Sequence, residues 1–395
     1  MRLWRVALLG LSAVALPLAC GKGSHPPSLA AEEPPDTGAA GRDGGPLMLD
    51  GDLDSSPQGP CGEQVIPVVT NPPNLSFIID HSGSMGDELA GSGLSKYENA
   101  RLALSQVLKA IGHRVSYGAA IFPGLAGKTG CEPGDELMRM APGDPPSYAR
   151  AGKTGPRLKD LLARLSIASV DGGTPASATL EKMSGVLSEL TGDTYVVLIT
   201  DGAPNCNDAI SCAASGCIPN IEDRTLAGME CRDGYNCCDP ANGVEGANIN
   251  CVDSQASLEA VQKLADAGIR TFVIGMPGSE PYEDLLNGMA ERGGTARGGD
   301  LEYYSVEDTN ALQEALSKIA ASVAISCEVP LDYEPPDRDY VNVFFDGVVL
   351  QYDPEDGWEW TEGGAVAIRG AACDQLMSGD VLELQVFAGC KTVVK

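Results

Sequence analysis

The sequence predicts an α/β protein with a doubly wound, mostly parallel sheet and a small C-terminal all-β module. Apolar segments of the buried-strand type alternate with amphipathic helical segments between residues 75 and 323. This alternation is typical of parallel sheets that are covered by helices on both faces. After residue 326, short apolar runs separated by Gly-containing turns indicate antiparallel strands instead.

The elements of the parallel sheet follow from uninterrupted apolar runs, and the helices from apolar residues that recur on one helical face. The expected strands are 75–79, 115–122, 195–200, 271–275 and 303–306, with a short edge strand at 136–140. The expected helices are 97–111, 158–165, 175–190, 258–267, 282–291 and 309–323. Ligands of such sheets bind beyond the carboxyl ends of the strands, where the strand order reverses. The polar residues after the first and fourth strands are therefore the first candidates for a site.

The C-terminal module is expected to contain strands at 341–345, 348–350, 365–368 and 381–387. Asp346-Gly347 is a strong hairpin indicator between the first two of them. Asp353, Glu355 and Asp356 are close enough in sequence for a calcium loop, but their spacing fits no EF-hand and an acidic turn explains them.

The chain begins with the features of an export signal. Arg2 and Arg5 precede an apolar run, 6–18, that is too short to span a bilayer. The end of this run and the two residues after it, Ala19 and Cys20, form a segment that resembles a bacterial lipoprotein cleavage box. That resemblance implies lipidation of Cys20 and a protein exported to the bacterial outer membrane or cell surface, with contact to the membrane through the lipid only. Ordinary cleavage with release is the alternative.

Composition then divides the remaining chain. Residues 1–19 are expected to be the signal peptide, and residues 20–60, dominated by Gly, Pro, Ser, Ala and Asp, a disordered tether. The expected folded domains are 61–326 and 327–395, the first carrying a Cys-rich insert at 205–251.

Acidic residues outnumber basic ones by far, with 55 Asp and Glu against 27 Lys and Arg and a formal charge of −28. An acidic surface of this size repels nucleic acid and anionic lipid, and it attracts cations. We therefore expect no nucleic-acid partner.

Oxygen-bearing side chains follow the first expected strand directly. Asp80, Ser82 and Ser84 alternate along a tight loop, and Gly83 lets the loop curl back. A carboxylate and two hydroxyls are hard ligands that suit Mg²⁺, Mn²⁺ or Ca²⁺ and suit copper or zinc poorly. Taken alone, each serine is better explained as a simple turn or N-cap residue than as a ligand.

This motif resembles the metal-ion-dependent adhesion site of von Willebrand factor A domains, which begins with Asp-x-Ser-x-Ser. Two further loops resemble that family in the expected order: Gly172-Gly173-Thr174, and Asp201 after the fourth strand. The resemblance covers residues 75–325. It implies a Rossmann-like fold in which Asp80, Ser82, Ser84, Thr174 and Asp201 hold one divalent cation, Mg²⁺ in the first place and Mn²⁺ or Ca²⁺ otherwise.

The same resemblance implies a function. The family's site leaves one coordination position open, so a protein partner is expected to offer an Asp or Glu oxygen to the ion. His81 lies between two of these residues but alternates away from the ion, so a solvent-facing or packing role is expected for it. A structural role, in which the cation stabilises an acidic envelope protein, is the alternative.

An enzyme is not expected. The chain has only three His, and none is positioned to form a triad with Ser and Asp. Metal-assisted hydrolysis at the Asp80 site would need a general base, whereas the motif supplies hydroxyls.

Cysteine parity is consistent with export. Of 13 Cys, removal of Cys20 leaves 12, an even number suited to disulfides in an oxidising compartment. Seven lie in the insert: Cys206, Cys212, Cys217, Cys231, Cys237, Cys238 and Cys251. Because seven is odd, one must pair elsewhere or stay free, and Cys131 is the natural partner. Cys61, Cys327, Cys373 and Cys390 form a second even set. A zinc knuckle built on Cys237-Cys238 is the less favoured alternative.

Overall fold

The computed structural model describes residues 64–66, 72–126, 129–232, 234–324, 326–331, 334–378, 381 and 383–394. The expected signal peptide, tether and lipidated Cys20 lie outside these residues, as does Cys61. No helix among the described residues combines the length and the apolar character needed to cross a bilayer.

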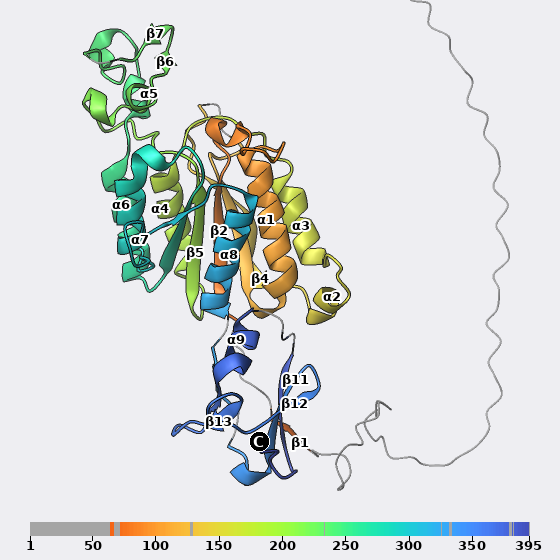
Figure 1. The fold of residues 1–395 in the computed structure, drawn as a ribbon. Coiled ribbons are helices and arrows are strands. Elements are labelled where there is room, and N and C mark those ends of the chain that lie inside the picture. The colour runs from red at the N-terminus through yellow and green to blue at the C-terminus, as the bar shows by residue number, and fades with distance from the viewer. Residues whose placement is uncertain are drawn as a thin grey trace, which may run out of the picture. The chain divides into compact units, whose positions relative to one another are not determined.

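A six-stranded sheet carries the first domain (Figure 1). Its strand order is β4 (Asp135–Pro142), β3 (Ser116–Phe122), β2 (Asn74–Asp80), β5 (Thr194–Thr200), β8 (Arg270–Gly275) and β9 (Tyr304–Ser305). Every neighbouring pair is parallel except β3 and β4, which are antiparallel. β2 lies between β3 and β5, so the strand order reverses between β2 and β5. The predicted doubly wound, mostly parallel sheet is confirmed.

Helices cover both faces of this sheet, because the strands are apolar on both sides. One face packs on α1 (Lys96–Ile111), α3 (Pro156–Leu165) and α8 (Thr309–Ala324). The other face packs on α4 (Ala176–Leu187), α6 (Ser254–Asp266) and α7 (Glu283–Arg292). Alternate residues of β2 enter the two cores: Phe77 and Ile79 on the first face, and Ile78 on the second. A short helix, α2 (Pro146–Arg150), follows β4.

The Cys-rich insert follows β5 and has only short regular elements. They are α5 (Ile218–Ile221), β6 (Thr225–Leu226), β7 (Met229–Glu230) and 3₁₀ turns at Ala214–Gly216, Pro240–Asn242 and Ala247–Asn250. In place of a large apolar core, its cysteines are buried in a cluster with residues such as Ile210 and Leu226. Disulfides therefore stabilise the insert, whereas apolar side-chain packing stabilises the sheet domain.

Two small antiparallel sheets follow α8. One contains β1 (Gln64–Ile66), β15 (Leu384–Ala388), β11 (Val341–Phe345) and β12 (Val348–Leu350) in that order. The other contains β10 (Glu328–Val329), β14 (Val366–Ile368) and β13 (Trp358–Trp360). Asp346 and Gly347 form the predicted hairpin turn, both with positive φ. Glu355 N donates to Asp353 Oδ1 at 2.9 Å, which is the geometry of an acidic turn.

The C-terminal module differs from the predicted all-β module in several elements, among them the unpredicted short strands β10 and β13. A helix, α9 (Gly370–Ser378), lies between β14 and β15. Ala372 and Leu376 of that helix are both buried. Their spacing of four residues is typical of one helical face and not of a strand. In addition, β1 pairs with β15, so this sheet takes one strand from a segment that precedes the parallel sheet in sequence.

Candidate metal centre

The candidate site lies where the strand order reverses. Asp80 is the last residue of β2, and Asp201 follows the last residue of β5. β2 and β5 are parallel neighbours with Ile79 opposite Ile199, so their carboxyl ends meet at one edge of the sheet. This register brings together two carboxylates that are 121 positions apart in the sequence.

The Asp80 carboxylate is fully buried and hydrogen-bonded on both oxygens. The Thr200 hydroxyl donates to Oδ2 at 2.6 Å, and the Ser82 backbone N–H donates to Oδ1 at 2.8 Å. A carboxylate oxygen can accept more than one bond, so each retains a lone pair. Asp80 is thereby fixed in orientation and still able to bind a cation.

The two serines and Asp201 form a connected group of oxygens. The Ser84 hydroxyl donates to Asp201 Oδ1 at 2.8 Å, and the Ser82 and Ser84 Oγ atoms lie 3.3 Å apart. Ser82 is the N-cap of a 3₁₀ turn over Gly83–Gly86, and Ser84 lies within that turn. Gly83 N donates to Gly172 O at 3.0 Å and links this loop to the second one.

Thr174 joins the site from the loop before α4. Its side chain is 5% exposed and lines the same cavity as Ser82 and Ser84. The backbone N–H of Thr174 donates to Asn205 Oδ1 at 2.7 Å, and Asn205 N donates back to Thr174 O at 2.9 Å. Asn205 therefore fixes the loop that carries the threonine.

The five predicted residues thus occupy one region. Ser82, Ser84 and Thr174 line a cavity of about 440 Å³, and Asp80 and Asp201 are buried at its base, 0% and 1% exposed. All five side chains that the sequence singled out carry hydroxyls or carboxylates, which is the donor chemistry of hard divalent cations.

Lys96, which sequence reasoning missed, lies against the carboxylate of Asp201. Its Nζ is 2.7 Å from Asp201 Oδ2, and the side chains of the pair are 9% and 0% exposed. Lys96 is the first residue of α1 and lies between the two capping-box residues Ser95 and Glu98. A cation in the first turn of a helix opposes the helix dipole. That disfavoured position, close to a predicted cation site, is the signal that could have identified it.

Two carboxylates next to one ammonium leave the buried cluster short of positive charge. Burial, and then repulsion by Asp201, raise the pKa of Asp80 to about 7. Its hydrogen bonds with Ser82 and Thr200 act in the opposite direction but are weaker. A divalent cation bound to these carboxylates would favour their ionised forms and so oppose both causes. The electrostatics and the donor set therefore fit a divalent ion held by Asp80, Ser82, Ser84, Thr174 and Asp201.

His81 packs inside the protein and faces away from the cavity. It is 3% exposed, with Nδ1 2.9 Å from Ser169 O and Nε2 2.6 Å from Pro123 O. The solvent-facing alternative is therefore wrong and the packing alternative holds. Both ring nitrogens are occupied by backbone carbonyls, so the ring is not available as a base for a substrate.

The disulfide between Cys131 and Cys206 borders the cavity and confirms that Cys131 pairs with the insert. The bridge packs directly on the threonine loop, since a Cβ built on Gly173 would lie 2.6 Å from the Cys206 sulfur. Gly173 N also donates to Gly130 O at 2.8 Å, next to Cys131. The bridge therefore ties together three loops that reach the site.

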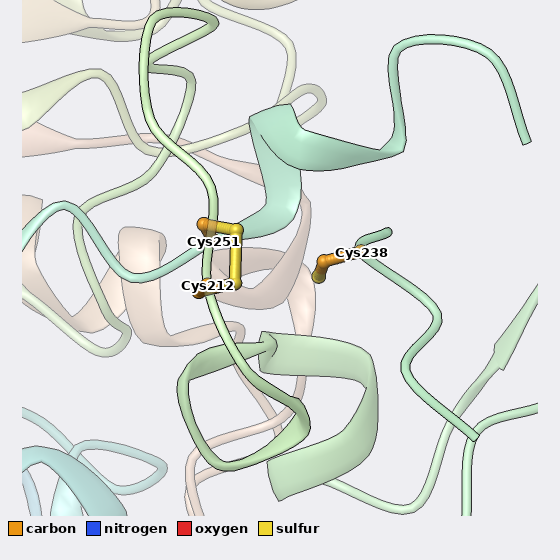
Figure 2. A group of neighbouring side chains, drawn as sticks. All are labelled: Cys212, Cys238 and Cys251. Atoms are coloured by element: carbon orange, nitrogen blue, oxygen red, sulfur yellow. A yellow bond between two sulfur atoms is a disulfide. The ribbon is translucent and has the colours of Figure 1, made fainter. Parts of the chain in front are cut away.

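The other insert cysteines are also paired. The bridges are Cys212–Cys251, Cys217–Cys238 and Cys231–Cys237, and Cys327–Cys373 lies in the C-terminal module. The sulfurs of Cys212, Cys238 and Cys251 lie within 4.8 Å of one another (Figure 2). All three are consumed in disulfides, so no thiolate remains there to bind zinc, and the zinc-knuckle alternative does not apply to this cluster. Cys390 forms no disulfide with any residue that the structure describes.

This chain is similar to known proteins in structure, but it matches none of the sequence families or curated sequences. The PilB minor pilin from Streptococcus sanguinis is similar over 66% of this chain and 62% of its own, at 17% identity and a TM-score of 0.41. The pilus adhesin SpaC from Lactobacillus rhamnosus GG is similar over 83% of this chain and 40% of its own, at 15% identity and a TM-score of 0.44.

The vWF domain of the type V pili tip protein Mfa5 from Porphyromonas gingivalis is also similar, over 65% of this chain and 96% of that domain. The identity is 13% and the TM-score 0.42. This chain thus spans less than two thirds of the PilB and SpaC chains that it matches. The similar structures include a von Willebrand factor A domain and pilus proteins, and TM-scores below 0.5 add no argument about function.

Proposed function

We propose that the chain is an exported, cell-surface binding protein that captures a protein partner through a divalent cation. In this proposal, Asp80, Ser82, Ser84, Thr174 and Asp201 hold the ion, with Mg²⁺ as the first candidate. When bound, the ion supplies a Lewis-acidic position that accepts an oxygen of an Asp or Glu side chain from the partner. The partner is a protein, and the chain itself catalyses no reaction.

The observation that carries this proposal is the buried pair of carboxylates beneath a hydroxyl-lined cavity. Two carboxylates, one ammonium on Lys96 and one divalent ion leave a single net positive charge at the base of the cavity. Since the hydroxyls of Ser82 and Ser84 add no negative charge, that positive charge is not cancelled. An anionic oxygen is the group that such a site attracts, even on a chain with a formal charge of −28.

Two other functions have less support. A purely stabilising cation needs no cavity beside it, yet three of the five residues line one of about 440 Å³. A metal-assisted hydrolase needs a general base beside the ion, and the nearest histidine, His81, uses both ring nitrogens on backbone carbonyls. Export and a lipid anchor at Cys20 remain part of the proposal on the sequence pattern alone.

Calorimetric titration with Mg²⁺ and a pull-down from the surface fraction of the source cells test the proposal together. Ser84→Ala should weaken Mg²⁺ binding by at least about tenfold, because it removes a ligand and the bond to Asp201. It should also abolish chelator-sensitive capture. Ser166→Ala is the matched control, because Ser166 is exposed and its hydroxyl donates to Ala163 O. This variant should behave like wild type.

The contrary results are specific. Capture that persists unchanged in chelator would rule out a metal-dependent function. Unfolding of the sheet domain on removal of Mg²⁺, without any partner captured, would favour the stabilising role. Turnover of ester or peptide substrates that Ser84→Ala abolishes would favour the hydrolase.

A further inference from the structure

The metal-site cavity has a second wall, and the insert supplies it. Ser82, Ser84 and Thr174 line one side, and the other side is lined from the insert by Ile218, Pro219, Glu222, Arg224, Leu226 and Ile249. The cavity, at about 440 Å³, falls within the usual range of ligand pockets, about 300–1,000 Å³. A group bound at the ion would therefore meet insert side chains as well.

The insert is attached to the sheet domain at several points around this cavity. Cys206 is bonded to Cys131, and its backbone N–H donates to Ile249 O at 2.8 Å. Tyr282, just before α7, donates its hydroxyl to Glu222 Oε1 at 2.9 Å. The wall is therefore fixed on both the strand β5 side and the α7 side.

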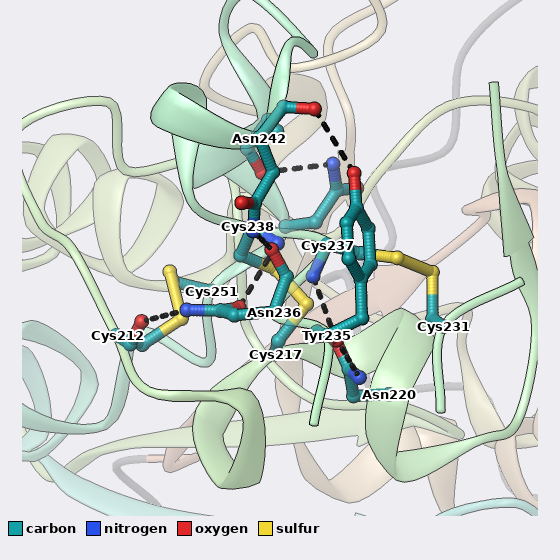
Figure 3. Close-up of a disulfide and its surroundings, with 12 residues drawn as sticks. Cys212, Cys217, Asn220, Cys231, Tyr235, Asn236, Cys237, Cys238, Asn242 and Cys251 are labelled. Atoms are coloured by element: carbon teal, nitrogen blue, oxygen red, sulfur yellow. Dashed lines mark hydrogen bonds between the residues drawn. A yellow bond between two sulfur atoms is a disulfide. The ribbon is translucent and has the colours of Figure 1, made fainter. Parts of the chain in front are cut away.

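Within the insert, disulfides and asparagine side chains replace regular structure (Figure 3). Asn236 Nδ2 donates to Cys212 O at 2.7 Å, and Asn236 Oδ1 accepts from Cys238 N at 3.1 Å. Asn220 Oδ1 accepts from Cys237 N at 3.1 Å, and the Tyr235 hydroxyl donates to Asn242 O at 2.9 Å. A wall ordered in advance lowers the entropy cost of binding.

This wall combines one ion pair with apolar side chains. Arg224 Nε lies 2.8 Å from Glu222 Oε2, with side chains 59% and 20% exposed. Both residues line the cavity, and Arg224 is the more exposed partner, since Glu222 also accepts from the Tyr282 hydroxyl. The ion pair uses Nε, and the four N–H groups on the terminal nitrogens can serve an anion. Ile218, Pro219 and Leu226 provide apolar surface on the same wall.

We infer that the insert selects the ligand, and that the ligand is a protein segment with two acidic side chains and an apolar side chain close together. One carboxylate binds at the ion, the second pairs with Arg224, and the apolar side chain packs on Ile218 and Leu226. Arg224 and Leu226 are then specificity-determining residues. This inference rests on the proposed function, since it needs the first carboxylate to bind through the metal.

Labelled decapeptides with a common central glutamate test the inference by fluorescence anisotropy in millimolar Mg²⁺. Their flanking residues are Asp and Leu, Asp and Gly, Lys and Leu, or Gly on both sides. Wild type should bind the peptide flanked by Asp and Leu at least about tenfold more tightly than the peptide flanked by Gly. Arg224→Glu should remove the preference for Asp over Gly, and Leu226→Asn the preference for Leu over Gly.

Arg232→Glu is the matched control, because Arg232 is an exposed arginine of the same insert that pairs with Glu230 and does not line the cavity. It should keep the wild-type ranking, and all variants should keep wild-type Mg²⁺ binding. If Arg224→Glu and Leu226→Asn retain the wild-type ranking, the insert does not select the ligand although the metal function stands. If wild type binds every peptide equally in Mg²⁺ and in chelator, the proposed function itself fails.

Discussion

The ammonium of Lys96 lies 2.7 Å from the carboxylate of Asp201, inside the group of residues proposed to hold a divalent cation. Both side chains are almost fully buried, at 9% and 0% exposure. A resident positive charge at this point has two effects on the site. It offsets one carboxylate when no ion is bound, and it reduces the attraction of the same carboxylates for an ion. Lys96 therefore sets the balance between the metal-free and metal-bound states.

Lys96→Met should separate these two effects. Loss of one partner of a buried pair leaves Asp201 uncompensated and costs about 3–5 kcal/mol in the metal-free chain. At roughly 2–4 °C for each kcal/mol, the melting temperature in chelator should fall by roughly 10 °C. Mg²⁺ should then bind at least about tenfold more tightly, because no ammonium repels it. Differential scanning fluorimetry across a Mg²⁺ titration measures both quantities.

Lys182→Met is the control for this experiment. Lys182 pairs with Asp135 at 3.3 Å, but the two side chains are 48% and 39% exposed. Exposed pairs contribute little, so this variant should behave like wild type in Mg²⁺. Equal Mg²⁺ affinity in Lys96→Met and wild type would mean that the ammonium does not act on the ion.

The pH dependence of Mg²⁺ binding should follow Asp80. Its pKa is raised to about 7, mainly by burial and then by Asp201, so below that pH a proton must leave when the ion binds. Mg²⁺ affinity should therefore rise by about tenfold for each pH unit up to about 7 and then level off. Asp80→Asn should lose Mg²⁺ binding and, with it, the pH-dependent gain in melting temperature on adding Mg²⁺.

The stability of the metal-free chain should move in the opposite direction. The folded pKa of Asp80 lies above its ordinary value of 3.8, so protonation favours the folded state. The contribution of Asp80 to stability is fully present below about pH 4 and is lost as the pH rises through about 7. Asp80→Asn should accordingly be as stable as wild type or more stable in chelator at pH 8. A clear loss of stability in that variant would contradict the assigned cause.

The sequence predicted the sheet well because its strands are buried on both faces. Continuous apolar runs such as 195–200 have few alternative structures in a soluble domain, and the observed β5 differs from that range by one residue. The C-terminal module was harder, because α9 is a short helix with only two residues, Ala372 and Leu376, in the buried cluster of that module. Tertiary packing decides the conformation of such a segment.

The candidate site likewise contains residues that the sequence predicted and residues that it did not. Asp80 and Asp201 could be predicted because a hydroxyl- and carboxylate-bearing motif follows each of two central strands. Lys96 and Arg224 were missed, since neither belongs to a motif and both reach the site through the fold. Lys96 comes from the start of α1, and Arg224 comes from an insert whose course is set by disulfides that the sequence leaves open.

The pairing of the remaining cysteines is a separate prediction. The Cys327–Cys373 bridge leaves Cys390 without a disulfide among the described residues, and Cys61 lies outside them. The β1–β15 register sets Gln64 opposite Ala388, and the two cysteines are three and two positions beyond that pair in sequence. We expect a peptide map under non-reducing conditions to contain Cys61 joined to Cys390. Alkylation of Cys390 in the native, non-reduced protein would contradict this pairing.

The Cys131–Cys206 bridge should control the metal site as well as stability. It closes a loop of 75 residues, which corresponds to about 4 kcal/mol in the chain-entropy model. Because the bridge packs on Gly173, next to Thr174, its loss should also release the threonine loop and weaken Mg²⁺ binding by roughly tenfold. The double variant Cys131→Ala/Cys206→Ala tests this by calorimetric titration. Cys327→Ala/Cys373→Ala is the matched control: its 46-residue loop is also worth about 4 kcal/mol, yet Mg²⁺ affinity should not change. Equal Mg²⁺ affinity in both double variants would restrict the Cys131–Cys206 bridge to a stabilising role.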